Sequence, residues 1–424
     1  MPGSILQKLY EKNYWTDVYQ FFENRSFRQD QKLASYQEII EKNQYSAIAS
    51  RVISKNYRFK PPLRLVVNKL QSGKKKTVYL FDYQDDFLLK VINRLLTDSF
   101  SYLISPSCHS FQKGKGAKTA FRSLVSDPFI DSKYCLKTDI RNFFNSVNVN
   151  DFIENLPKEI ISDQILYELI KQILLNNNAR LPDGRIITEQ KGLMAGCPLA
   201  PFLSNIYLRS LDDIFTKQNI TYTRYSDDIV LFDHECKIEE HRKTIETFLA
   251  NKNLFLNKEK TSITIPGEMA IFLGFSYSKG VIDLSPVSVN KMKGKIKRMA
   301  RSYNRRLKRG KMDDTGILRH FISRINRKMY GIDAQENNLC WAHWFFPVIN
   351  THKSLEILDR YIQERLRFSI TGKNNKHNFG RVPYKTLKSL SYKPLKATFY
   401  VFKSNYHKYM QILQSDYKLL NTNE

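Results

Sequence analysis

The spacing of hydrophobic and polar residues along the chain predicts both helices and strands. Between residues 1 and 60, apolar side chains recur at helical spacing, as in QKLASYQEII (31–40). Residues 61–80 instead alternate apolar and polar side chains on both sides of a turn at Gly73, which predicts two paired strands. From 288 onward the spacing is again mostly helical. Strands mixed with helices, followed by a helical C-terminal part, predict an α+β chain with an appended helical domain.

Short strands flank the polar features in the middle of the chain. YCLKTDIR (134–141) predicts a strand that ends at Asp139, and NITYTRYSDDIVLF (219–232) predicts two strands around a polar tip. RLPDGRIITEQK (180–191) predicts a hairpin with an Asp-Gly turn. Further elements are predicted as helices over 85–98, 151–177, 199–216 and 236–252, and as a strand pair over 269–283.

The net charge of the chain says more about its binding partners than its overall composition does. The 424 residues include 68 Lys and Arg against 41 Asp and Glu, a formal charge of +27, and 42% are hydrophobic. So apolar a chain is not disordered, and its length allows two to three domains. The excess of cations predicts a polyanionic partner, because Lys and Arg neutralise phosphates and release counterions.

The cysteines and the apolar runs exclude several protein classes. Five cysteines without a CxxC pair argue against a disulfide framework or a zinc ribbon. No apolar run is long enough to span a bilayer, and the N-terminus does not resemble a secretory signal. We therefore expect a soluble, cytoplasmic protein that does not associate with membranes.

A dense run of cations between residues 291 and 311 contains no acid. Several of these side chains recur at steps of three and four residues, which places them in one stripe along a helix. The stripe is predicted to contact a nucleic-acid backbone and comprises Lys291, Lys295, Arg298, Arg301, Arg305 and Lys308.

The acids at the polar hairpin tip predict a metal site. Asp227 and Asp228 are adjacent and repel each other unless solvent or a divalent cation neutralises them. Asp139, at a strand end, is the third carboxylate that would complete a site for two Mg2+ ions, with Mn2+ as a substitute. The similar YQDD at 83–86 precedes a helical run, so its acids are interpreted as helix N-terminal caps.

Taken in order, these motifs resemble those of reverse transcriptases. The set comprises Asp139 followed by two phenylalanines, the GLMAGCPLAP turn (192–201), YSDD (225–228), LFLNKEKT (254–261) and FLGF (272–275). PFLSNIYL (201–208) is typical of bacterial enzymes related to group II intron and retron reverse transcriptases. The resemblance implies a right-hand fold and RNA-templated DNA synthesis with two divalent metals. It predicts a helical extension (1–60), fingers and palm (61–284), a basic helical thumb (285–375) and a helical tail (376–424).

The resemblance also implies roles for individual residues. Asp139, Asp227 and Asp228 match the catalytic, metal-binding triad, with the carbonyl of Ile140 as an extra ligand. Phe144 matches the ring that excludes a 2′-hydroxyl, while Phe143 is better explained as core. The other matches to nucleotide-binding positions are Lys74, Lys76, Ala195, Gly196, Tyr225 and Lys260, the last near the leaving pyrophosphate.

Two departures narrow the resemblance. Ala195 stands where relatives commonly have Gln, which puts ordinary fidelity and nucleotide affinity in question. No zinc-bearing endonuclease segment follows the thumb, and the thumb lacks marks expected of a standard retron enzyme. The chain therefore resembles most the defence-associated (unknown-group) bacterial reverse transcriptases. The resemblance implies a structured non-coding RNA template, a DNA primer and product, dNTPs and an anti-phage role.

Two alternatives remain at this point. Ala195 and the tyrosine-rich tail, with Tyr392 and Tyr400 among its residues, motivate an untemplated or protein-primed DNA polymerase. A non-catalytic RNA-binding scaffold is the alternative from another class. The clustered aromatics near Trp341 are interpreted as core rather than as a base-stacking surface. The oligomeric state is not predicted.

Overall fold

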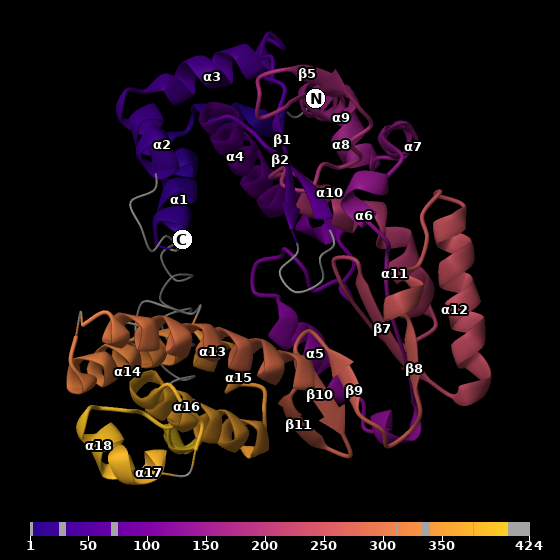
Figure 1. Ribbon diagram of the computed structural model, residues 1–424. Coiled ribbons are helices and arrows are strands. Elements are labelled where there is room, and N and C mark those ends of the chain that lie inside the picture. Colours follow the sequence, from indigo (N-terminus) through magenta and orange to yellow (C-terminus); the bar gives the residue numbers. More distant parts are fainter. Residues whose placement is uncertain are drawn as a thin grey trace. The chain divides into compact units, whose positions relative to one another are not determined.

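A computed structural model of the protein describes residues 3–24, 31–68, 75–310, 312–331, 340–375 and 377–405. The chain forms two compact units, one up to Pro266 and one from Gly267 onward. Both contain helices and strands, and the C-terminal unit is mainly helical, which confirms the predicted α+β class. Figure 1 labels the elements of each unit.

Helices precede the first sheet, as predicted. They are η1 (Ile5–Tyr10), α1 (Lys12–Glu23), α2 (Gln31–Glu41) and α3 (Gln44–Ile53). Helices η1, α1 and α2 pack with α4 (Tyr83–Phe100), and α3 packs with η1 and α2. Trp15 of α1 is fully buried and meets Phe87 of α4 edge to face, with 5.1 Å between ring centroids. The N-terminal helices therefore share one core with the centre of the unit.

The acids of the YQDD segment lie in the first turn of α4, but their side chains bond to neighbouring elements. Asp85 accepts hydrogen bonds from the Tyr57 hydroxyl (2.6 Å) and the Lys60 amide (3.0 Å). Asp86 pairs with Lys32 of α2 at 2.7 Å. Asp86 therefore ties α4 to α2, and Asp85 ties it to the segment between α3 and β1, contacts that the interpretation as simple helix caps did not include.

The first sheet has the strand order β2-β1-β4-β5. Strands β1 (Leu63–Asn68) and β2 (Lys75–Leu80) are antiparallel, as the alternation predicted. Strands β4 (Asn178–Arg180) and β5 (Ile186–Thr188) form the predicted hairpin. The turn between β1 and β2 lies outside the described residues, and so does Lys74.

The second sheet, with the order β6-β7-β3-β8, carries the three acids. Its strands are β3 (Tyr134–Asp139), β6 (Thr221–Tyr225), β7 (Asp228–Asp233) and β8 (Ser262–Thr264), all pairing antiparallel. Helix α12 (Glu235–Ala250) packs along β3 and β7 (Figure 1). Both faces of β7 are apolar and buried, since the four consecutive residues from Ile229 to Phe232 are all enclosed.

Short helices complete the N-terminal unit. They are η2 (Ser101–Leu103), α5 (Ala117–Val125), η3 (Ile130–Ser132), α6 (Phe143–Ser146), α7 (Val149–Glu154), α8 (Lys158–Ser162), α9 (Gln164–Leu175), α10 (Ala200–Tyr207), α11 (Arg209–Lys217) and η4 (Lys258–Lys260). Phe143 is fully buried, as predicted for a core residue.

The C-terminal unit combines a small sheet with helices. Strands β9 (Ala270–Phe272), β10 (Phe275–Ser278) and β11 (Val281–Leu284) form a three-stranded sheet, of which the sequence predicted two strands. The helices are α13 (Pro286–Lys308), α14 (Asp314–Tyr330), α15 (Trp341–Phe345), α16 (Lys353–Thr371), α17 (Asn378–Arg381) and α18 (Tyr384–Ser389).

Aromatic side chains build the core of the C-terminal unit. Phe346 is buried, and its ring lies 5.3 Å from that of Phe399. Phe345 meets Phe275 of β10 at 5.3 Å. Phe345 and Phe346 of the cluster that begins at Trp341 therefore belong to the core, in agreement with the sequence interpretation, whereas Trp341 and Trp344 are only partly buried. The division of the chain into extension, fingers and palm, thumb and tail stays a prediction.

Candidate active site

The pairing of β3 with β7 brings distant acids together. Asp139, the last residue of β3, is the register partner of Asp228, the first residue of β7. The Ile140 amide then donates to the carbonyl of Asp227 at 3.2 Å. The structure thus gathers Asp139, Asp227 and Asp228 at one end of this sheet, where the sequence predicted the metal-binding triad.

The turn that carries Asp227 is strained, and hydrogen bonds from residues outside the turn hold it in place. Tyr225 and Asp228 close the β6–β7 hairpin, and Ser226 between them has φ of 60°. A non-glycine residue in the left-handed region costs on the order of 1–3 kcal/mol and persists only where the surroundings enforce it. The Ser226 amide donates to Ser110 Oγ at 2.9 Å, and its carbonyl accepts from Arg224 Nη1 at 3.0 Å.

Arg224 belongs to a fully buried ion pair beneath this turn. Its Nε and Nη2 bind the two carboxylate oxygens of Asp212 at 2.7 and 2.6 Å, and neither side chain is exposed. Burial lowers the pKa of Arg224, but attraction to Asp212 and to neighbouring groups, together with the hydrogen bonds to Asp212, outweighs burial and raises the pKa, so the guanidinium stays charged. Asn205 connects this pair to the Ser110 loop, since its Oδ1 accepts from Ser110 Oγ at 3.0 Å.

The proximity of the acids changes their titration. Burial, followed by repulsion from Asp227 and Asp139, raises the pKa of Asp228 to about 6. Burial also raises the pKa of Asp227, and repulsion from Asp139 adds to it. Carboxylates that hinder each other's ionisation favour a bound cation, because its positive charge compensates the repulsion.

A lysine supplies part of that positive charge. Lys260 pairs with one carboxylate oxygen of Asp139, and the side-chain amide of Asn257 donates to the other at 3.0 Å. Burial lowers the pKa of Lys260, but the bond to Asp139 and attraction to the other two acids outweigh it and raise the pKa. The sequence placed Lys260 near a leaving pyrophosphate; here it reaches the acid cluster itself.

The carboxylates of Asp139, Asp227 and Asp228 are the kind of ligand that a hard divalent cation prefers. Their present arrangement does not enclose a metal ion. Within the described ranges, no three His, Cys, Asp or Glu side chains are arranged to hold a metal ion. The acids nonetheless offer only oxygen atoms, which magnesium prefers, and the Lys260 ammonium shows that a cation is accommodated at Asp139. A metal would be held by Asp139, Asp227 and Asp228.

The loop 192–196 is fitted tightly between two other elements. A Cβ on Gly192 would lie 2.5 Å from the carbonyl oxygen of Phe144, and one on Gly196 would lie 2.5 Å from that of Tyr79 in β2. Both glycines also have positive φ, of 58° and 109°. Only glycine permits so close an approach of one backbone to another.

Ala195 is fixed through its backbone. Its amide donates to Asn145 Oδ1 at 2.9 Å, and its carbonyl accepts from the Tyr79 amide at 2.8 Å. The Asn145 side-chain amide also donates to the carbonyl of Thr77 at 3.2 Å. Phe144, Ala195 and Gly196 line one cavity of about 960 Å³ together with Lys76 of β2, whereas Tyr225 and Lys260 are not part of its lining. That these residues bind a nucleotide stays a prediction.

The other sequence-predicted residues are also located. Tyr225 precedes the turn and lies beside Phe111, with 6.4 Å between ring centroids. The predicted basic stripe lies on α13, and all of its side chains are exposed, which suits a polyanion-binding surface. Burial, followed by repulsion from Lys295 and Arg324, lowers the pKa of Lys328, so cations of α14 adjoin this stripe.

Sequence reasoning missed two functional features. Arg224 lies next to YSDD, but its partner Asp212 sits in one of several Asp-Asp pairs, and only the fold selects that pair. Phe111 gave no sequence signal beyond its polar, glycine-rich surroundings. It has φ of 57° and is exposed beside Tyr225.

Comparison with known protein families finds a match to the central part of the chain. Residues 83–277 match the family described as reverse transcriptase (RNA-dependent DNA polymerase). This segment, which is less than half of the chain, is similar to reverse transcriptase domains. It includes Asp139, the 192–196 loop and YSDD, so the acids lie in the part of the chain that the family covers.

Retron enzymes are among the curated relatives. The Retron Ec83 reverse transcriptase of Escherichia coli is 27% identical over 197 residues, covering 39% of this chain and 61% of the relative. The Retron Ec73 reverse transcriptase of the same species is 27% identical over 187 residues, covering 40% and 53%. The chain is thus related to bacterial retron reverse transcriptases, although it spans less than two thirds of the length of each.

A solved structure of telomerase from Candida albicans aligns with 86% of this chain and 70% of its own, at 11% identity and a TM-score of 0.41. A likeness this weak supports no functional inference.

Two further observations bear on the alternatives and expectations drawn from the sequence. In the described part of the chain, no helix is long and apolar enough to cross a membrane. Tyr392 of the tail is buried and donates its hydroxyl to Asp359 at 2.8 Å, whereas Tyr400 is half exposed and contacts His352. The tyrosines beyond residue 405 lie outside the described residues.

Proposed function

We propose that this protein is an RNA-directed DNA polymerase whose reaction takes place at Asp139, Asp227 and Asp228. The observation that carries the proposal is the register of β3 and β7, which sets Asp139 opposite Asp228 inside the segment that is similar to reverse transcriptase domains. The substrates would be an RNA template, a DNA primer and dNTPs.

In this reaction a primer 3′-hydroxyl attacks the α-phosphate of a dNTP, a new phosphodiester bond forms and pyrophosphate leaves. Divalent metals, when bound by the three acids, supply charge neutralisation and lower the pKa of the attacking hydroxyl. The chain's own residues orient the reactants, which is the main protein contribution to such transfers.

Individual residues divide this work. Phe144 would pack against the sugar and exclude a 2′-hydroxyl, and Lys76 would approach the triphosphate. Lys260, which pairs with Asp139, would exchange that partner for phosphate oxygens. Ala195 would contribute its rigidly held backbone rather than a side chain.

Primer extension on a defined RNA tests this assignment. We expect Asp227→Ala with Asp228→Ala to abolish dNTP incorporation while the affinity for RNA persists. Asp183→Asn, at an exposed turn far along the chain from the acids, also removes a carboxylate charge and is a control that should keep full activity. Undiminished synthesis by the double variant would overturn the site.

We propose further that the template is a structured non-coding RNA and that synthesis serves defence against phage. This part is supported by the motif resemblance and by the retron relatives, whose names state reverse transcription only. Phage plating on cells that carry the native locus tests it. Equal plating on cells with wild-type protein and with the double alanine variant would contradict it.

A further inference from the structure

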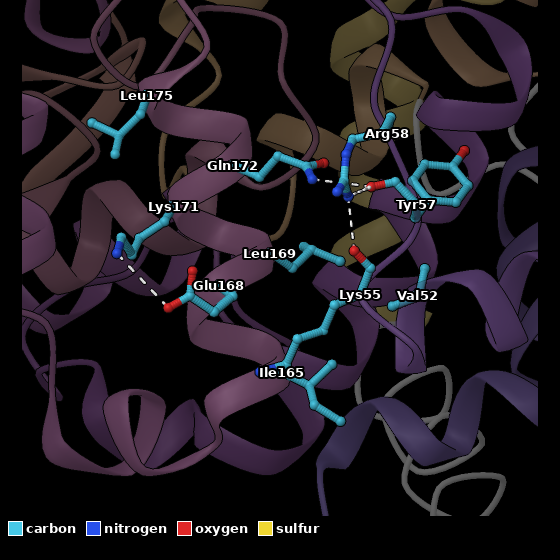
Figure 2. Close-up of a pocket in the computed structure, with 10 residues that line it drawn as sticks. All are labelled: Val52, Lys55, Tyr57, Arg58, Ile165, Glu168, Leu169, Lys171, Gln172 and Leu175. Carbon is cyan, nitrogen blue, oxygen red and sulfur yellow. Dashed lines mark hydrogen bonds and ion pairs between the residues drawn. The ribbon is translucent and has the colours of Figure 1, made fainter.

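A second cavity of the N-terminal unit is lined by residues other than those predicted to bind a nucleotide. It has a volume of about 480 Å³ and is formed by the end of α3, the segment 55–58 and one side of α9 (Figure 2). The wall made by α3 and 55–58 precedes residue 83, so it lies outside the segment that matches the reverse transcriptase family. The family match therefore implies no role for this cavity.

The turn after α3 builds one wall of the cavity. The amides of Asn56 and Tyr57 both donate to the carbonyl of Arg51, at 2.8 and 2.9 Å, which ends α3 and reverses the chain. Arg58 then fixes the turn, since its Nη1 donates to the carbonyl of Lys55 at 2.7 Å and to that of Tyr57 at 2.9 Å. The turn thereby holds two cations, Lys55 and Arg58, at the cavity.

The apolar part of the cavity is mainly aliphatic. Val52 and Leu169 are buried, whereas Leu175 of α9 is 43% exposed and offers its side chain to a ligand. The one aromatic residue of the lining, Tyr57, is buried, and its hydroxyl donates to Asp85. Proteins hold unpaired bases on exposed aromatic faces, so this lining suits an aliphatic side chain better than a nucleic-acid base.

The charged side chains of the cavity favour an acidic ligand. Three of them are cations, Lys55, Arg58 and Lys171, against the single acid Glu168. Lys171 and Glu168 are partly exposed and 3.7 Å apart, a weak pair that a ligand can displace. Lys55 and Arg58 are exposed, and within the part of the chain that the structure describes neither forms an ion pair with an acid. The cavity therefore complements a negatively charged partner.

Arg58 offers a specific geometry for a carboxylate. Its Nη1 is occupied by the two backbone carbonyls, whereas its Nε and Nη2 have no hydrogen-bond partner among the described residues. These two nitrogens lie on one edge of the planar guanidinium, and such an edge binds both oxygens of a carboxylate. From the opposite wall, Gln172 Nε2 donates to the Tyr57 carbonyl at 3.0 Å, so α9 helps to hold an acceptor of Arg58 (Figure 2).

We propose that this cavity is a docking site for an acidic segment of a partner protein. An aliphatic side chain of the partner would enter between Val52, Leu169 and Leu175. A neighbouring carboxylate would bind the Nε–Nη2 edge of Arg58, while Lys55 at the rim attracts further acids. An apolar anchor inside a polar rim is the usual construction of a protein interface. The site needs no catalysis, so the proposal does not depend on the proposed function.

Selection from a random peptide library displayed on yeast tests the proposal, with the full chain as bait. We expect the enriched peptides to share an aliphatic residue with aspartate or glutamate beside it. A parallel selection on the Arg58→Gln variant should lose this motif. The Arg185→Gln variant, which changes an exposed arginine outside the cavity, should enrich the same motif as wild type. It therefore separates specific docking from the general attraction of acids to a basic protein.

Titration of a synthetic peptide with the enriched sequence measures the two parts of the site separately. Arg58→Gln should weaken binding about tenfold, because charge-assisted hydrogen bonds are lost. Leu175→Ser, at an exposed position that tolerates substitution, should weaken it roughly fivefold through lost apolar contact. Ile186→Ser removes an equally exposed aliphatic side chain outside the cavity and should bind as wild type. Primer extension should be unchanged in all these variants.

Several results would overturn the proposal. They are the absence of a shared motif, equal enrichment on wild type and Arg58→Gln, and peptide binding that Leu175→Ser leaves unchanged. A loss of RNA affinity in both cavity variants would assign the cavity to RNA instead, and a dimer of the chain that Leu175→Ser dissociates would assign it to a second copy. Normal primer extension without a shared motif refutes the docking site alone, whereas motif-dependent binding without any synthesis refutes the proposed function alone.

Discussion

The buried ion pair of Asp212 and Arg224 makes a quantitative prediction. Asp212→Asn keeps the size of the side chain and removes its charge. The Arg224 guanidinium then remains without a counterion at a position with no solvent exposure. The Tyr222 hydroxyl, which donates to Asp212 at 2.7 Å, also loses a charged acceptor.

The expected cost follows from this geometry. Removing one partner of a buried ion pair destabilises a protein by about 3–5 kcal/mol, because the other charge stays buried. A domain of roughly this size loses about 2–4 °C of melting temperature per kcal/mol. We therefore expect Asp212→Asn to lower the melting temperature of the N-terminal unit by roughly 6–20 °C.

The adjacent acid provides the control. Asp213 is partly exposed and its carboxylate lies 3.7 Å from Arg209, so the pair is worth about 0–1 kcal/mol. Calorimetric melting of Asp212→Asn and Asp213→Asn side by side isolates burial from charge. Equal melting temperatures for the two variants would refute the reasoning, since both changes remove one carboxylate charge.

Further predictions follow from single contacts. Gly196→Ala should abolish primer extension because its methyl group would meet the Tyr79 carbonyl. Gly184→Ala, which carries the same strain of a positive φ but has open space around its Cβ, should keep most activity. Phe144→Ala should raise ribonucleotide incorporation relative to deoxyribonucleotide by about tenfold, a change of about 1.4 kcal/mol, measured as a ratio of kcat/KM; an unchanged ratio would contradict its role. Burial lowers the pKa of His109 to about 4. The unfolded chain binds this proton near pH 6.5 and the folded chain only near 4, so stability is complete above 6.5 and falls by up to about 3 kcal/mol as pH drops towards 4. Denaturant melts of wild type and His109→Gln over this range should diverge, and parallel curves would show that His109 does not cause the loss.

Much of the central sheet could be predicted from the sequence because its strands are short apolar runs bounded by polar and turn residues. In β7 the buried residues come directly after YSDD, so the hairpin and its tip follow from local pattern and turn length. The placement of Asp139 against Asp228 follows from the motif set, since Asp139 ends β3 and Asp228 begins the antiparallel strand β7 beside it.

Contacts between remote segments could not be predicted in the same way. Asp212 gains its importance from Arg224 and Asn205, which lie on other elements, and no local pattern separates it from Asp213. Similarly, helical spacing predicted α1 but not that Phe21 would line a cavity shared with Gly196. Burial patterns specify which face of an element is apolar, whereas the partner of that face depends on the whole fold.

The YQDD segment shows that a correctly predicted helix does not reveal which partners its side chains bind. The helix was predicted where α4 lies, yet Asp85 and Asp86 bond to Tyr57, Lys60 and Lys32. Two carboxylates at a helix start satisfy the same sequence rule whether they cap that helix or bind neighbours. Only the position of the N-terminal helices decides between these outcomes.

The most direct test of the central claim is to sequence the RNA and the DNA that co-purify with the protein from its native cells. The Asp227→Ala, Asp228→Ala double variant is purified alongside. RNA-templated synthesis at the three acids predicts DNA complementary to a bound RNA with wild-type protein, and no such DNA with the variant. DNA unrelated to any bound RNA, or complementary DNA at the same level in the variant, would contradict the claim.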